Sequence, residues 1–157
     1  GVSGTGKSTI ARAIAREIDG VFLDADDFHP SENVAAMSNG YPLTDEMRAG
    51  WLKTVCSAAS LHQNEGVTVA CSALKKAYRD TIRKGVAGCR FVFLDVSREV
   101  LQDRMTNRPG HYMPVSLLDS QLDTLERPSA DEPDILLVDG TLQVSNIVSA
   151  VLDFVAN

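Results

Sequence analysis

Apolar residues recur along this chain with two different periods, which predict helices and strands in alternation. Between residues 8 and 19, Ile10, Ile14 and Ile18 share one face at helical spacing, so this segment is expected to form an amphipathic helix. Short apolar runs predict four strands, at residues 21–24, 67–71, 91–95 and 135–139. Strands that alternate with helices predict an α/β fold with three layers, in which helices cover both faces of a parallel sheet.

Further helices are expected between and after these strands. Thr44 and Ser97 each precede a helical pattern and are predicted to be N-caps, and Ser72 could cap the helix after the second strand. The remaining helical segments are expected at residues 31–40, 117–125 and 142–156. The sequence contains no internal repeat or linker, so residues 1–157 are expected to form a single domain.

The first nine residues match the pattern of a phosphate-binding loop, which is Gly, four residues, Gly, Lys and then Ser or Thr. Glycines let the backbone curl so that its N–H groups point at an anion, and the positive end of the following helix faces the same place. Lys7 can reach the β- and γ-phosphates of a nucleotide, and the Ser8 hydroxyl can ligate Mg²⁺. An accidental glycine-rich turn is the alternative, but the helix in the expected place disfavours it. The candidate nucleotide-binding residues are Gly1, Val2, Ser3, Gly4, Thr5, Gly6, Lys7, Ser8 and Thr9.

A loop of this kind normally follows a buried strand, and no residue precedes Gly1 in the sequence. We therefore expect an apolar first strand of roughly ten residues upstream of Gly1, at the centre of the sheet.

Three acids and a histidine follow the first predicted strand. The carboxyl ends of parallel strands lie at one edge of the sheet, so Asp24 is expected at that edge, where it could hold Mg²⁺ through water. Asp26 could accept the proton of a substrate hydroxyl. The alternative is that Asp27 or Ser31 only caps the next helix, and for Asp27 and His29 neither interpretation is preferred.

Two arginines are candidates for binding an anionic substrate. Arg48 lies one turn before Trp51 on nearly the same helical face, so it could point into a cleft or be exposed. Arg79 lies on a basic helix after the second strand, and its planar fork could pair with a carboxylate. A solvated basic face is the alternative for Arg79.

Two further arginines predict a lid. Arg104 and Arg108 are four residues apart on one helix, and residues 109–114 after them contain Pro and Gly. A lid over residues 104–125 could exclude water and bring positive charge onto a phosphate as it is transferred. Solvated arginines in a loop are the alternative.

Composition narrows the class of protein. The chain has 157 residues, of which 44% are hydrophobic and 23% charged, as in ordinary globular proteins, and its net charge of −6 argues weakly against a nucleic-acid partner. The three cysteines, Cys56, Cys71 and Cys89, are interpreted as buried thiols in a reducing compartment. No apolar run approaches the ~20 residues that span a bilayer and no signal peptide is visible, so a cytoplasmic protein without a membrane partner is expected.

Several longer motifs resemble those of the small P-loop gluconokinases, and the resemblance covers nearly the whole chain. They are Gly-Val-Ser-Gly-x-Gly-Lys-Ser at 1–8, Leu-Asp-x-Asp…His-Pro at 23–30, Met-x-x-Gly-x-Pro-Leu-x-Asp at 37–45, Cys-Ser-Ala-Leu-Lys-Lys-x-Tyr-Arg-Asp at 71–80 and Gly-His-x-Met at 110–113. The resemblance implies ATP-dependent phosphorylation of D-gluconate to 6-phosphogluconate with Mg²⁺, usually in a homodimer. It also implies a fold similar to that of shikimate and nucleoside-monophosphate kinases, with a five-stranded parallel sheet.

Roles for the candidate residues follow from the motifs and the resemblance together. Lys7 is expected to hold ATP phosphates, Ser8 and Asp24 to hold Mg²⁺, and Asp26 to orient the gluconate 6-hydroxyl and take its proton. The resemblance implies that the acceptor's hydroxyls and carboxylate are bound by His29, Arg48 and Arg79. Arg104 and Arg108, at the predicted lid, are expected to neutralise the transferring group. The alternatives are a P-loop kinase for another small hydroxy acid such as shikimate, or a nucleotide-binding module without turnover.

Overall fold

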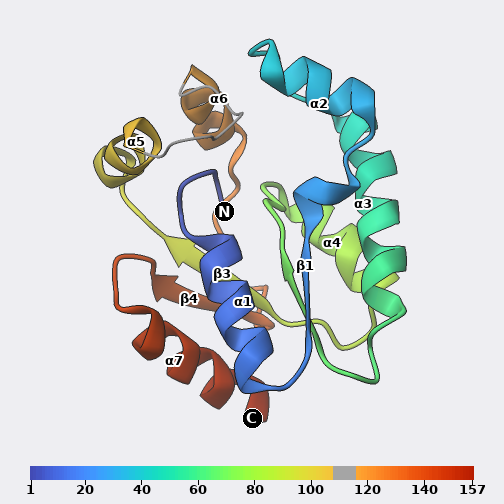
Figure 1. The fold of residues 1–157 in the computed structure, drawn as a ribbon, viewed down its shortest axis with the longest axis vertical. Helices are drawn as coiled ribbons and strands as arrows, with labels where there is room; N and C mark the ends of the chain where they lie inside the picture. Colours follow the sequence, from blue (N-terminus) through green and yellow to red (C-terminus); the bar gives the residue numbers. More distant parts are fainter. Residues whose placement is uncertain (108–115) are drawn as a thin grey trace.

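The computed structural model describes residues 1–107 and 116–157. Its elements follow one another as helices and strands in alternation over most of the chain (Figure 1). In chain order they are α1 (Lys7–Glu17), β1 (Val21–Asp24), the 3₁₀ helix η1 (Ala25–Phe28), α2 (Ser31–Ser38), α3 (Asp45–Ser60), β2 (Val67–Ala70), α4 (Lys76–Gly85), β3 (Phe91–Asp95), α5 (Arg98–Thr106), α6 (Ser116–Thr124), β4 (Ile135–Asp139) and α7 (Val144–Ala156).

The four strands form two parallel pairs. In one pair β1 lies beside β2, with Asp24 opposite Ala70 at the carboxyl end. In the other pair β3 lies beside β4, with Asp95 opposite Asp139.

Gly1 lies at the carboxyl ends of both pairs, because its nitrogen donates to the Ser72 carbonyl just after β2 and it lies beside the Leu94 carbonyl of β3. All four strands thus end at one edge, where parallel sheets of this kind bind their ligands.

Alternating side chains on the strands show that helices cover both faces. On β2, Thr68 donates a hydrogen bond to the Ala11 carbonyl of α1 at 2.8 Å, whereas Val67 and Val69 pack with Cys56 of α3. Because successive side chains of a strand point to opposite faces, α1 and α3 lie on opposite sides of β2. Helix α7 packs beside α1, and α4 beside α3 (Figure 1). The expected three-layer α/β arrangement is confirmed.

The two strand pairs are not hydrogen-bonded to each other within the described residues. A cavity of about 670 Å³ lies between them, with Val67 and Val69 of β2 and Val92 and Leu94 of β3 among its walls. Its apolar lining suits the central strand expected upstream of Gly1, which stays a prediction.

The structure confirms two of the three N-caps predicted at Thr44, Ser97 and Ser72. Thr44 Oγ1 accepts from the Met47 N–H at 3.2 Å, and Ser97 caps α5 in the same way. The prediction that Ser72 caps the next helix is wrong, because α4 begins only at Lys76. Ser72 belongs instead to a non-helical loop that contains Ala73, whose φ of +37° is rare for a residue with a side chain.

The three cysteines are free thiols, as the sequence predicts, but only Cys56 is fully buried, and Cys71 and Cys89 are half-buried. None of the described helices has the length and apolarity needed to cross a bilayer.

Helix α3 offers a matched pair of leucines for testing the core. Leu52 is 1% exposed within the main apolar cluster, whereas Leu61 at the end of the helix is 81% exposed. We expect Leu52→Ala to lower the free energy of unfolding by about 2–5 kcal/mol, since it removes buried surface and leaves a cavity. Leu61→Ala is expected to change it by less than about 0.5 kcal/mol. Urea unfolding followed by circular dichroism measures both, and equal losses would contradict this core.

Candidate active site

The loop before α1 has the geometry of an anion cradle. Gly4 and Gly6 adopt φ of +85° and +96°, values that favour glycine, and Gly6 is the N-cap of α1. The positive end of the helix therefore opens onto the loop. Lys7 Nζ folds over the loop and donates to the Val2 carbonyl at 2.8 Å. An arriving phosphate would offer this ammonium a charged acceptor in place of a neutral one.

The first turn of α1 is joined to the end of β1 by one hydrogen bond. Ser8 Oγ donates to Asp24 Oδ2 at 2.8 Å, and the other carboxylate oxygen, Oδ1, accepts from the Asp26 N–H at 3.2 Å. Mg²⁺ usually binds through one or two carboxylates together with waters and substrate phosphates. A hydroxyl and a carboxylate facing each other beside a phosphate cradle fit that ion. Within residues 1–107 and 116–157 no three His, Cys, Asp or Glu side chains form a larger metal-binding group.

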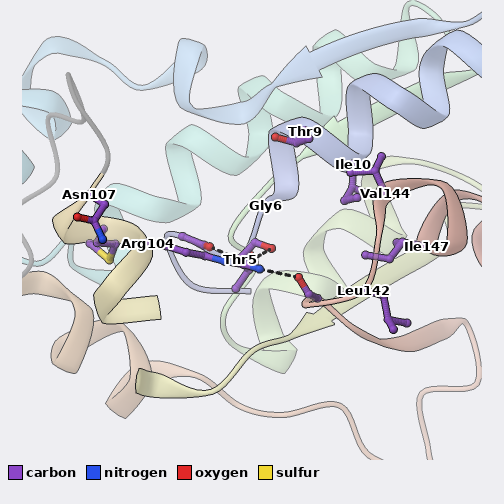
Figure 2. Close-up of a pocket in the computed structure, with 12 residues that line it drawn as sticks. Thr5, Gly6, Thr9, Ile10, Arg104, Asn107, Leu142, Val144 and Ile147 are labelled. Carbon is purple, nitrogen blue, oxygen red and sulfur yellow. Dashed lines mark hydrogen bonds between the residues drawn. The ribbon is translucent and has the colours of Figure 1, made fainter. Parts of the chain in front are cut away.

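A cavity of about 450 Å³ opens on the other side of the loop (Figure 2). Its lining residues are Gly4, Thr5, Gly6, Thr9, Ile10, Arg104, Met105, Asn107, Gly140, Leu142, Val144 and Ile147. Arg104 of α5 crosses it, with Nη1 donating to the Gly4 carbonyl at 3.2 Å and Nη2 to the Gly140 carbonyl at 3.0 Å. A mostly apolar slot beside a phosphate cradle has the character of a nucleoside pocket.

Asp26 lies on the turn of η1, on the opposite side from this cavity. Its carboxylate is half-exposed and stands 3.7 Å from His29 Nε2, while the other ring nitrogen, Nδ1, faces the Asn33 amide at 3.2 Å. The His29 ring stacks on Trp51 of α3, with centroids 4.2 Å apart. The Trp51 indole in turn donates to the Ala25 carbonyl at 2.6 Å, so α3 fixes the turn that carries Asp26.

Burial sets the charge of His29. Loss of hydration first, and then the nearby positive charge of Arg48, lower the pKa of His29 from 6.5 to about 4. The imidazole is therefore neutral near pH 7. It can donate one hydrogen bond toward Asp26 without competing with it for a proton.

Arg48 is a buried cation without an acidic partner. It is 8% exposed, and its Nε donates to the Leu43 carbonyl at 3.3 Å. Within the described part of the chain no carboxylate oxygen lies within 4.0 Å of its guanidinium, which stands 5.6 Å from the centre of the Tyr78 ring. Buried charges are costly unless they are paired. An anionic ligand at this point would supply the missing charge.

A second cation, Lys75, lies near the Tyr78 ring. Lys75 Nζ stands 5.6 Å from the Tyr78 ring centre and 2.9 Å from Asp45 Oδ1, and the Tyr78 hydroxyl also donates to Asp45. Asp45 thus joins the start of α3 to the start of α4. Hydrogen bonds from Tyr78 and Lys75 lower the pKa of Asp45, so it is ionised at neutral pH.

Arg79 of α4 is paired with an acid of the protein itself. It is 4% exposed, and its guanidinium forms two hydrogen bonds with the Glu132 carboxylate, at 2.8 and 2.6 Å. This pairing satisfies its charge without any ligand. The prediction that Arg79 binds the acceptor is not supported by this geometry.

Comparison with known proteins agrees with these features. The family model for shikimate kinase matches residues 3–156. The thermosensitive gluconokinase of Escherichia coli is 46% identical over 149 residues, which make up 94% of this chain and 80% of that protein. The chain belongs to the shikimate kinase family, among the gluconokinases.

Two solved structures of this family share the fold. A gluconokinase from Sinorhizobium meliloti is 44% identical with a TM-score of 0.87, and the match covers 99% of this chain and 87% of that one. A sugar kinase from a Janibacter species is 41% identical with a TM-score of 0.90, covering 99% and 90%. The P-loop kinase architecture expected from the sequence is thereby shown.

The structure brings most of the predicted site residues of this gluconokinase-family chain to one edge of the strands. Lys7, Ser8, Asp24 and Asp26 follow one another there, and Arg104 reaches the loop from α5. Arg108 and the middle of the expected lid, residues 108–115, lie outside the described residues. Helix α6 does contact the loop, because Gln121 Oε1 accepts from the Ser3 N–H at 2.7 Å.

Sequence reasoning missed the cluster of Asp45, Lys75 and Tyr78. A signal was present, since Asp45 and Arg48 are three residues apart, as are Lys75 and Tyr78. Each spacing places two side chains on one helical face. The sequence could not show that these two faces meet.

The low pKa of His29 predicts a pH dependence of stability. The unfolded chain takes up this proton near pH 6.5, whereas the folded chain does so only near pH 4. The contribution of neutral His29 to the free energy of unfolding is therefore complete above about pH 6.5. It is lost as the pH falls toward 4, by up to about 1.4 kcal/mol per pH unit. We expect His29→Gln to remove this part of the pH dependence, measured by urea unfolding at pH 7 and pH 5.

His62→Gln, in the loop after α3, is the control and is expected to keep the wild-type difference between the two pH values. If His29→Gln loses as much stability as the wild type between pH 7 and pH 5, the buried neutral imidazole is refuted.

Proposed function

We propose that this protein transfers the γ-phosphate of ATP to the 6-hydroxyl of D-gluconate. The observation that carries the proposal is the line of groups along the strand edge. A phosphate cradle and the Ser8–Asp24 pair stand next to Asp26, and the buried cation of Arg48 lies beyond His29. The identity of the acid rests on the gluconokinases among the relatives and on the solved gluconokinase.

Each group has a task in the transfer. Lys7 and the loop N–H groups bind the β- and γ-phosphates, and Arg104 and Arg108 neutralise charge on the transferring group. Mg²⁺, held by Ser8 and by Asp24 through water, would neutralise the same phosphates when bound. The acceptor oxygen bonds to the γ-phosphorus, the bond from that phosphorus to the β,γ-bridging oxygen breaks, and ADP leaves with the electron pair. Asp26 takes the hydroxyl proton.

The acceptor has its carboxylate at the opposite end from its 6-hydroxyl. With the hydroxyl at Asp26, an extended six-carbon chain directs the carboxylate away from the phosphates, past His29. Arg48 is buried there without an acidic partner, and Lys75 stands across the Tyr78 ring. We assign the carboxylate to Arg48. His29 is assigned to the acceptor's hydroxyls.

We further propose that the enzyme works in the cytoplasm as a homodimer. Free thiols at all three cysteines are consistent with a reducing compartment. The dimer rests on the family resemblance alone.

A panel of acceptors tests this function and the role of Arg48 together. We expect ATP-dependent ADP release with gluconate, and far less with shikimate or with D-glucitol, which has the same carbon chain without a carboxylate. In Arg48→Met the KM for gluconate should rise roughly ten- to hundred-fold, the value of a hydrogen bond to a charged group, while turnover of D-glucitol changes little.

Preference for shikimate would favour the alternative hydroxy-acid kinase. ATP binding without acceptor-stimulated ADP release would favour a nucleotide-binding module without turnover. An unchanged gluconate KM in Arg48→Met would remove the carboxylate from Arg48.

Asp26 has a matched control in its neighbour Asp27, which is also exposed on η1. We expect Asp26→Asn to lower kcat roughly 10²–10⁴-fold, because the acceptor loses its general base. ATP affinity, measured by calorimetry, should be unchanged. Asp27→Asn should retain near-normal kcat. A loss confined to ATP affinity in Asp26→Asn would show that this carboxylate does not serve the acceptor.

A further inference from the structure

The buried pair of Arg79 and Glu132 takes no part in the proposed phosphate transfer. Glu132 lies in the loop between α6 and β4, and its side chain is 1% exposed. Both of its oxygens accept from Arg79, and Oε2 also accepts from Arg83 at 2.9 Å. These hydrogen bonds lower the pKa of Glu132 to about 2, so the carboxylate is ionised at every working pH.

The third side of the Arg79 guanidinium faces backbone. Its Nη1 donates to the Glu126 carbonyl at 3.0 Å and lies 3.4 Å from each of the carbonyls of Ala73 and Leu74. These last two belong to the loop from Ser72 to Lys75, which joins β2 to α4. Ala73 holds an unusual positive φ there, a conformation that persists only where its surroundings impose it. Arg79 is one such restraint.

The chain after α6 is bonded to the same loop. The Glu126 N–H donates to the Leu74 carbonyl at 2.9 Å, and the Glu126 carboxylate accepts from the Lys76 N–H at 2.7 Å. Arg79 and Glu126 therefore fix the Ser72–Lys75 loop from two sides. Lys75, the last residue of that loop, reaches Asp45 in the acceptor-side cluster.

Direct binding of a ligand by Arg79 would require breaking this arrangement. The guanidinium would have to leave a carboxylate that is almost wholly buried, and uncompensated buried charge is strongly destabilising. An arginine held by two hydrogen bonds to a buried carboxylate is suited to holding the backbone around it.

We propose that Arg79 and Glu132 are positioning residues for the acceptor site. Through the Ser72–Lys75 loop they hold Lys75 and Tyr78 beside Arg48, so they act on acceptor affinity without touching the acceptor. This inference rests on the proposed function for its substrate.

The same ionic network contains a matched control. Arg83 is bound by Asp134 through two hydrogen bonds, at 2.7 and 2.8 Å, on the more exposed side of the network. Within the described residues, Asp134 bonds to Arg83 and to the Phe91 N–H and not to the Ser72–Lys75 loop. Asp134→Asn therefore weakens the network and leaves the loop restrained.

The test is a double-mutant cycle with Glu132→Gln, Arg79→Lys and the double variant, beside Asp134→Asn. We expect each single variant to raise the KM for gluconate roughly ten- to hundred-fold, with the KM for ATP within twofold of wild type. The double variant should raise the KM for gluconate no more than either single variant does, because both changes release the same loop. Asp134→Asn should lower the Tm and leave both KM values unchanged.

Two results would overturn the proposal. If Arg79→Lys raises the gluconate KM while Glu132→Gln leaves it unchanged or lowers it, Arg79 touches the acceptor directly. If Glu132→Gln lowers only the Tm, as Asp134→Asn does, the pair has only a stabilising role.

Hydrogen exchange gives a readout that does not depend on the substrate. Backbone amides of residues 72–76 should exchange faster in Glu132→Gln than in Asp134→Asn, and equal protection would refute the restraint.

Should Glu132→Gln fail to fold, Glu126→Gln loosens the same loop from an exposed side chain. It should raise the gluconate KM, and an unchanged KM would count against the proposal. A wild-type enzyme that does not phosphorylate gluconate would refute the proposed function, while the exchange result would still decide the role of the pair.

Discussion

The hydrogen bond from Ser8 to Asp24 is the contact on which the geometry of the site depends. It joins the first turn of α1, which carries the phosphate cradle, to the carboxyl end of β1, which carries the turn with Asp26. One oxygen of the Asp24 carboxylate therefore accepts from the Ser8 hydroxyl, and the other fixes the Asp26 backbone. In the proposed reaction, the same aspartate would hold phosphate donor and acceptor in register. Proximity of this kind is a major source of rate in phosphoryl transfer, where the protein mostly positions and neutralises.

Helix α3 supplies the second half of this alignment. Trp51 binds the Ala25 carbonyl and supports the His29 ring, and Arg48, one turn earlier, lies on the acceptor side. Burial keeps His29 neutral beside that arginine, so the acceptor region contains one uncompensated positive charge rather than two. In the proposed reaction, a monoanionic acid would meet a single cation without a carboxylate partner, which favours acids over neutral sugars of the same length.

Local sequence patterns were sufficient for most of the fold. The strands at residues 91–95 and 135–139 and the caps at Thr44 and Ser97 appear where apolar periodicity and capping chemistry place them. The prediction for Ser72 failed because a positive φ at Ala73 delays the next helix, and tertiary contacts impose that φ. Glu132 is 53 residues from Arg79 in the sequence, so no local pattern could show that the arginine was already paired.

The partners of the buried arginines distinguish their tasks. Of the arginines that are not exposed within residues 1–107 and 116–157, Arg79 and Arg83 are paired with carboxylates, whereas Arg48 and Arg104 donate only to backbone carbonyls. A carbonyl orients a guanidinium without cancelling its charge, so its field remains available to an anion. One of these two arginines stands at the nucleoside cavity and the other on the acceptor side. In a chain with a net charge of −6, local positive potential for anionic ligands depends on such cations donating to carbonyls rather than to carboxylates.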